Sequence, residues 1–233
     1  MLASVWSTET PRAIFVAWDT LGVETYRHQL WPTYQGDRVF DTAIVEQLGE
    51  LPALCAAFEF GVAKVSGYEA DDLMAAATRR EVGEGGSCLL LTSDRDAYQL
   101  VSDSVTMLAP RRGVREMDRI GPLEVVERLG VLPEQVPDYK ALAGDSSDRI
   151  PGAKGVGPKT AAALLLRHGT LDEVVAESKR PGEAELLLRF REIVRMRPDV
   201  DVTLPIASPA WANGATRLRT LGAVRLADRL GGL

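Results

Sequence analysis

Five carboxylates in two short stretches constrain this chain more than any other feature. The stretches are GYEADDL and LLLTSDRDAYQL, and their acids are Glu69, Asp71, Asp72, Asp94 and Asp96. Like charges this close together repel, and a bound divalent cation is a common way to compensate them. The alternative interpretation is ordinary capping: a pair of acids at a helix start and an Asp-x-Asp turn need no metal.

The acids lie at the ends of predicted secondary-structure elements. The apolar run Ala13 to Trp18 is followed by Asp19, and the run Ser87 to Thr92 leads into Asp94, as expected for buried parallel strands. A third strand is predicted at 62–65, and the helix 70–81 carries acids in its first turn. Alternating strands and helices predict an α/β fold with a mostly parallel sheet. Because ligands bind beyond the carboxyl ends of such strands, we expect all these acids to converge on one edge.

The remaining elements of the first half are less sharply defined. We expect a partly helical loop over 22–38, a helix over 41–60 that Pro52 kinks or divides, a helix starting at 98–101, a strand at 105–108 and a turn or hairpin at 111–116.

The second half has a different character and is predicted to be helical. Helices are expected at 122–129, 136–143, from about 158, at 171–176 and at 183–196, and a strand at 200–205. The tail contains a Trp-Ala-Asn-Gly turn and one last helix. We therefore divide the chain into a core at 1–119, a helical module at 120–205 and a tail at 206–233.

A glycine-rich stretch between two of these helices predicts contact with phosphates. Glycines allow close backbone approach, and free N–H groups at the start of the next helix attract anions. The residues concerned are Gly152, Lys154, Gly155, Gly157, Lys159 and Thr160. This pattern is typical of a helix–hairpin–helix that binds the DNA backbone. It is not a P-loop, because Pro158 separates the last glycine from the lysine. The alternative is a flexible connector between packed helices.

Two further acids precede that stretch, in the sequence GDSSDR. Asp145 and Asp148 are candidates for the far side of the metal site, although Asp145 could equally cap a helix.

Composition excludes several other kinds of protein. Net charge is −6 and the pI is near 5.1, which taken alone argues against nucleic-acid binding. However, four Lys or Arg and no acid occur between Arg149 and His168.

Two histidines are too few for a histidine metal site, and no serine or cysteine nucleophile motif is present. Cys55 and Cys88 are expected to be reduced, and we expect no signal peptide, no membrane span and a cytoplasmic location.

Oxygen ligands without His or Cys suit Mg²⁺ or Mn²⁺. Two such ions can activate a water molecule and stabilise the leaving oxygen in phosphodiester cleavage.

Taken together, the motifs over roughly residues 5–200 resemble the 5′-nuclease domain of bacterial DNA polymerase I and the stand-alone bacterial 5′–3′ exonucleases or flap endonucleases. The matching blocks are GYEADDL, LLLTSDRDAYQLVSD and YKALAGDSSDRIPGAKGVGPKTAAALL. The resemblance implies a PIN-like α/β core with a helical arch, a helix–three-turn–helix DNA-binding module, and cleavage of 5′ ends and flaps with Mg²⁺ or Mn²⁺. It further implies K⁺ in the hairpin. We expect the stand-alone type, acting as a monomer near the nucleoid.

The same resemblance assigns roles by position. It implies metal ligands at Asp19, Glu69, Asp71, Asp72, Asp94, Asp96, Asp145 and Asp148, with Asp19 among the catalytic residues. Tyr34 and Arg38 match arch residues that steer the 5′ strand, and residues 152–160 match the hairpin.

Three positions depart from the family pattern. Gln35 stands where relatives carry an arch lysine, and Arg149 stands where they carry Asn. Residues 1–11 resemble the end of the family's first helix, so the first strand and its Asp have no counterpart here. These departures leave two alternatives open: a nuclease whose given chain is incomplete at its N-terminus, which we favour, and a non-catalytic paralogue that binds branched DNA. A third hypothesis is an RNA-directed PIN-type nuclease, although the hairpin module favours duplex DNA.

Overall fold

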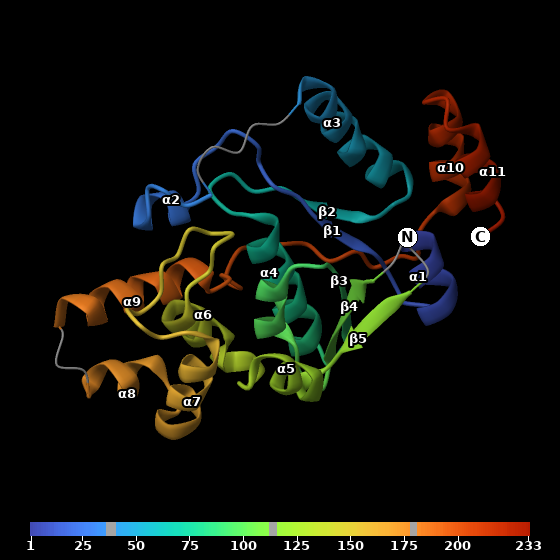
Figure 1. Cartoon of the computed structure of the whole chain (residues 1–233). Helices are drawn as coiled ribbons and strands as arrows, with labels where there is room; N and C mark the ends of the chain where they lie inside the picture. The colour runs from blue at the N-terminus through green and yellow to red at the C-terminus, as the bar shows by residue number, and fades with distance from the viewer. Residues whose placement is uncertain (36–40, 112–115, 178–180) are drawn as a thin grey trace. The chain divides into compact units, whose positions relative to one another are not determined.

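The computed structural model describes residues 1–35, 41–111, 116–177 and 181–233 (Figure 1). The chain forms two compact units, each assembled from separate segments. Unit 1 contains Met1–Val23, Arg38–Arg80 and Pro198–Leu233; unit 2 contains Glu24–Asp37 and Glu81–Arg197. The division expected at residue 119 stays a prediction.

Unit 1 contains a parallel strand pair with helices. Its elements are α1 (Leu2–Glu9), β1 (Phe15–Ala17), α3 (Thr42–Ala57), β2 (Gly61–Ala63), most of α4 (Ala70–Gly83), α10 (Trp211–Thr220) and α11 (Val224–Leu230). Phe15 pairs with Gly61 in the parallel register of β1 and β2. The strands at 13–18 and 62–65 and the helix at 70–81 are thus confirmed. Pro52 lies inside a single helix, α3.

The last helix predicted in the tail is confirmed as α11, whereas an aromatic cluster explains why the Trp-Ala-Asn-Gly turn was predicted wrongly. Phe58 stacks on Phe60 with ring centroids 5.1 Å apart, and Trp211 meets both rings edge-on. Trp211 to Gly214 does not reverse the chain; these residues form the first helical turn of α10. A Cβ at Gly214 would lie 2.1 Å from the Phe58 ring, so this glycine permits close packing rather than chain reversal.

The predicted strand at 200–205 is also wrong, since this segment has no regular secondary structure. Val202 is buried against Leu73 and Ala76, and its carbonyl accepts a 2.7 Å hydrogen bond from Arg80. Packing against α4 therefore accounts for the apolar sequence without strand pairing.

Unit 2 has a three-stranded sheet. β3 (Cys88–Leu91) pairs in parallel with β4 (Val105–Pro110), which pairs antiparallel with β5 (Met117–Ile120). The strands predicted at 87–92 and 105–108 are confirmed, but β5 was not recognised as a strand. The turn or hairpin predicted at 111–116 falls mostly on residues outside the described ranges. The helix expected at 98–101 is instead a 3₁₀ helix, η1 (Arg95–Leu100). The Asp94 side chain caps it by accepting from the Asp96 N–H.

The helices of unit 2 follow the prediction closely. They are α2 (Tyr26–Leu30), α5 (Pro122–Leu129), η2 (Pro133–Gln135), α6 (Val136–Ala143), α7 (Pro158–His168), α8 (Leu171–Ala176) and α9 (Pro181–Val194). In Figure 1, α6 to α9 (yellow to orange) form one group of neighbouring helices. Phe190 of α9 is fully buried there, and Trp31 meets its ring edge-on. No helix among the described residues is both long and apolar enough to cross a membrane.

Candidate metal centre

Three carboxylates of unit 2 form a compact group, the acid trio. Asp96 comes from η1, and Asp145 and Asp148 from the loop between α6 and α7. One carboxylate oxygen of each lies within 4.8 Å of those of the other two. Asp148 is buried and Asp96 nearly so. Asp94 is exposed, and its side chain is the cap of η1. The structure thus brings together three of the four acids that the sequence predicts in this unit.

A lysine bridges two members of the trio. The Lys140 ammonium lies 2.6 Å from Asp145 Oδ2 and forms an ion pair with Asp96 Oδ1. All three side chains are 12–13 % exposed. The sequence interpretation gave Lys140 no role. The available signal was a single lysine in the last turn of an otherwise mostly apolar helix, five residues before Asp145.

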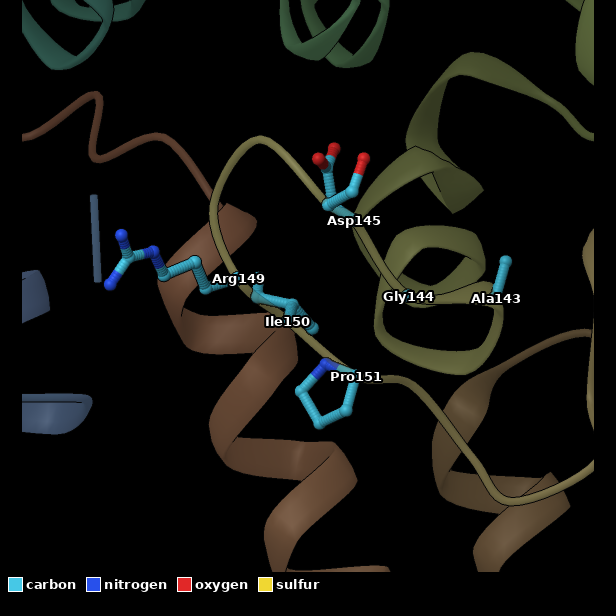
Figure 2. A pocket seen from close by; sticks show the side chains of 7 residues that line it. Ala143, Gly144, Asp145, Arg149, Ile150 and Pro151 are labelled. Atoms are coloured by element: carbon cyan, nitrogen blue, oxygen red, sulfur yellow. The ribbon is translucent and has the colours of Figure 1, made fainter. Parts of the chain in front are cut away.

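The loop that carries Asp145 and Asp148 closes on itself through its backbone. Asp145 and Ile150 exchange two hydrogen bonds, of 2.8 and 2.7 Å. Gly152 has φ +74°, and a Cβ there would lie 2.5 Å from Gly144 N, so this position requires glycine. The loop lines a pocket in Figure 2, where the Arg149 side chain points away from the Asp145 carboxylate.

Arg149 departs from the family pattern at a special backbone position. Its φ is +58°, a left-handed conformation that Asn adopts far more readily than Arg. The Trp31 indole donates a hydrogen bond of 3.2 Å to its carbonyl. The geometry thus explains the Asn of the family motif, and Arg149 occupies that conformation at some cost.

Two carboxyls of the trio, Asp145 and Asp148, have opposite pKa shifts. Burial is the largest influence at Asp145 and would raise its pKa, but hydrogen bonds from Lys140 and Ser147 outweigh it and the pKa is lowered. At Asp148 burial raises the pKa, and the nearby Asp145 and Asp94 charges act in the same direction. A hydrogen bond from Gln35 opposes this rise without cancelling it.

The segment that contains α2 reaches the trio through Gln35. Gln35 Nε2 donates to Asp148 Oδ1 at 3.1 Å and to the Tyr34 hydroxyl at 2.8 Å. The Tyr34 ring is buried, and its edge-on partner is His28. Arg38 lies outside the described residues.

Unit 1 holds the other four predicted ligands around the start of α4. Asp19 Oδ1 accepts from the Ala70 N–H at 2.7 Å, and Asp72 Oδ2 accepts from the Glu69 N–H at 3.1 Å. Asp72 is fully buried, whereas Asp19 is exposed and Asp71 is half-buried. The capping interpretation therefore describes Asp19 and Asp72, and it is compatible with a further role as ligands.

The glycine-rich stretch lies between α6 and α7, as predicted. Gly157 precedes α7, and Lys154, Lys159 and Thr160 are exposed. Gly155 has φ +79° with open space around it. The Lys154 backbone N–H donates to the Glu183 carboxylate at 3.1 Å, so a hairpin amide already receives an anionic group here.

The donors of the trio fit a hard divalent cation. All are carboxylate oxygens, which Mg²⁺ and Mn²⁺ prefer. A cationic group, the Lys140 ammonium, already lies between two of them. This arrangement is what a centre of excess negative charge requires.

Two family models cover nearly all of the chain. Residues 1–130 match the 5′-3′ exonuclease N-terminal resolvase-like domain, and residues 131–213 match the 5′-3′ exonuclease C-terminal SAM fold. The chain therefore belongs to the 5′-3′ exonuclease family, and the expected combination of a PIN-like α/β fold and a helical module is confirmed.

Curated relatives agree with this assignment. The chain is 39 % identical to DNA polymerase I of Mycobacterium tuberculosis over 214 residues, which is 89 % of this chain and 24 % of that protein. It is 40 % identical to DNA polymerase I of Deinococcus radiodurans over 184 residues, 76 % of this chain and 19 % of the relative. The chain thus spans about a quarter or less of the length of these relatives.

Solved structures share the fold. A mutant of the T5 5′-exonuclease superposes with a TM-score of 0.70 at 23 % identity, covering 84 % of this chain and 79 % of the other. The bacteriophage T5 flap endonuclease, in a pseudo-enzyme-product complex with DNA and metal ions, superposes with a TM-score of 0.69 at 20 % identity, covering 99 % and 85 %.

Proposed function

We propose that this chain is a structure-specific 5′–3′ DNA exonuclease and 5′-flap endonuclease that uses two divalent cations, Mg²⁺ or Mn²⁺. The observation that carries the proposal is the acid trio, three clustered carboxylates of which two lie in the loop that leads to the glycine-rich stretch. The family assignment supports nuclease chemistry, and the T5 relative's complex with DNA and metal ions supports the choice of ligands.

Each group of residues has a proposed role. The metal ligands are Asp96, Asp145 and Asp148 with Asp94 in unit 2, and Asp19, Glu69, Asp71 and Asp72 in unit 1. Bound cations would lower the pKa of a water molecule and neutralise the charge that develops on the phosphate. Gln35 positions Asp148 through its hydrogen bond, and buried Tyr34 positions Gln35. For Arg38 we keep the proposed role of steering the 5′ strand.

The hairpin would hold duplex DNA by its backbone. Lys154 and Lys159 add positive charge beside the start of α7, where free N–H groups attract phosphate. Such contacts carry no base specificity, which suits recognition of DNA structure rather than sequence. We extend the proposal to K⁺ in the hairpin.

The decisive experiment is cleavage of a 5′-labelled flap DNA with Mg²⁺, Mn²⁺ or EDTA. Replacing Asp94 and Asp96 together by Asn should abolish metal-dependent cleavage while the Kd for flap DNA changes little. Cutting by that double variant at the wild-type rate would refute the metal assignment. Competition with a matched RNA flap separates the RNA-directed alternative.

A second candidate, a protein that binds branched DNA without cutting it, is favoured by one observation. The arch side chain at Asp148 is the neutral Gln35, where a positive charge would help stabilise a transition state. This candidate expects salt-dependent binding, lost in Lys154→Ala with Lys159→Ala, and no turnover with any metal. If the chain binds DNA without cutting it, Gln35→Lys should introduce cleavage where the wild type has none. If the first proposal holds, the same variant should cleave faster than the wild type.

A further inference from the structure

Lys140 is the one described lysine or arginine shown to bridge two members of the acid trio. Lys140 lies in the last turn of α6, and its ammonium forms ion pairs with Asp96 of η1 and Asp145 of the loop that follows α6. The third acid, Asp148, receives the neutral amide of Gln35 instead. Only 13 % of the Lys140 side chain is exposed. A lysine is rarely so buried without paired charges, so the trio and this ammonium stabilise each other.

We propose that Lys140 is a built-in counter-ion of the metal centre, and that a divalent cation binds by displacing its ammonium from Asp96 and Asp145. The inference rests on the proposed function, since it concerns the same carboxylates. It adds that the metal-free and metal-bound centres differ in the position of one side chain, which sets the metal affinity.

The argument begins with charge. Three ionised carboxylates and one ammonium leave the centre with excess negative charge, so it still attracts a cation. The carboxylate oxygens that a cation would bridge lie within 4.8 Å of one another, and two of the three acids already contact the ammonium. A divalent ion and an ammonium bound to such closely spaced oxygens would repel each other strongly, because these side chains are largely shielded from water.

The lysine side chain can relieve that repulsion. It is a strongly hydrated point charge on a flexible stem of four carbons, so rotation about its torsions can carry it to solvent. Leaving the trio costs the ammonium two ion pairs but restores its hydration. Metal binding and ammonium binding are therefore competing events, and each lowers the affinity of the centre for the other.

Mn²⁺ binding measured by calorimetry tests the competition. Lys140→Met removes the charge and keeps most of the stem. It should bind Mn²⁺ more tightly than wild type, by roughly 5- to 150-fold, the usual range for coupled sites. The same variant without metal should unfold at a lower temperature, because the trio has lost its counter-ion. Lys64→Met removes an exposed lysine of unit 1 and should leave both quantities unchanged.

The direction of the affinity change is diagnostic. Structural damage by Lys140→Met would weaken Mn²⁺ binding, so unchanged or weaker binding would overturn the inference. If wild type and both variants all fail to bind Mn²⁺, the proposed metal centre itself is wrong and the inference falls with it. If Mn²⁺ binds equally to wild type and Lys140→Met, the metal centre stands and only the counter-ion role is lost.

Amine labelling of the wild-type chain gives a second test that needs no variant. In EDTA, acetylation of Lys140 followed by mass spectrometry should be several-fold slower than that of Lys64. Adding Mg²⁺ should accelerate labelling of Lys140 and leave Lys64 unaffected. A Lys140 amine that stays equally protected at saturating Mg²⁺ would show that ammonium and metal coexist, which contradicts displacement.

Discussion

Two groups of carboxylates in this molecule satisfy their charge in different ways. At the start of α4, Asp19 and Asp72 accept from the backbone N–H groups of Ala70 and Glu69. In the acid trio, Asp96 and Asp145 share the Lys140 ammonium. Helix starts supply neutral donors and a favourable dipole, so acids there are partly compensated before any cation binds. The trio depends instead on an ammonium, and its remaining negative charge favours a bound cation.

The largest expected effect concerns the loop that holds Asp145 and Asp148. Gly152→Ala combines φ +74° with a Cβ only 2.5 Å from Gly144 N and 2.7 Å from the Leu142 carbonyl oxygen. It should lower the free energy of unfolding by about 3 kcal/mol or more, measured by urea denaturation.

Gly155→Ala is the matched control for that change. Its φ is +79°, but nothing lies within 4 Å of the added Cβ, so only the left-handed conformation costs energy, about 1–2 kcal/mol. Equal losses in the two variants would mean that close packing of the loop contributes nothing.

The helix-start group should respond to the loss of a hydrogen-bond acceptor rather than of charge. Asp72→Ala leaves the Glu69 N–H without that acceptor and should cost about 1–2 kcal/mol of stability in EDTA. Asp72→Asn keeps an acceptor oxygen and should cost clearly less. The comparison fails if the Asn variant is as unstable as the Ala variant in thermal unfolding.

Within the trio, the two shifted carboxyls should affect stability with opposite signs. The lowered pKa of Asp145 stabilises the fold at pH above the ordinary Asp value, and this contribution is lost as pH falls through the lowered pKa. The raised pKa of Asp148 means that stability falls as pH rises from the ordinary value through the raised one.

Neutral variants in EDTA test these signs. At pH 7, Asp145→Asn should destabilise the metal-free chain and Asp148→Asn should stabilise it, because the two pKa values are shifted in opposite directions. Both differences should shrink as the pH is lowered. Stability changes of the same sign in the two variants would show that the pKa values of Asp145 and Asp148 are not shifted in opposite directions.

The smallest expected effect is at Arg149. Its φ of +58° suits Asn, so Arg149→Asn should stabilise the chain by about 0.5–1 kcal/mol, visible as a small rise in Tm. A fall in Tm instead would mean that the arginine side chain makes contacts that outweigh its backbone strain.

Local sequence patterns predicted most of the helices and strands and identified the acids of the candidate site. Helices α5 and α6 occupy the predicted ranges 122–129 and 136–143. Each has a proline in its first turn and a glycine directly after its last residue, and such start and stop signals act locally. The strands before Asp19 and Asp94 were also located from a local pattern, a short apolar run, although all of β1 and most of β3 are only partly buried.

Tertiary structure alone decided the rest. Val200 to Pro205 carries the composition of a strand, but Val202 finds its burial against α4 without pairing. Gly214 lies under the Phe58 ring rather than in a turn. Above all, Lys140 neutralises acids that lie 44 positions earlier and 5 later in the sequence. Sequence fixes which groups are charged, whereas only folding in three dimensions decides which charges meet and how far they are removed from water.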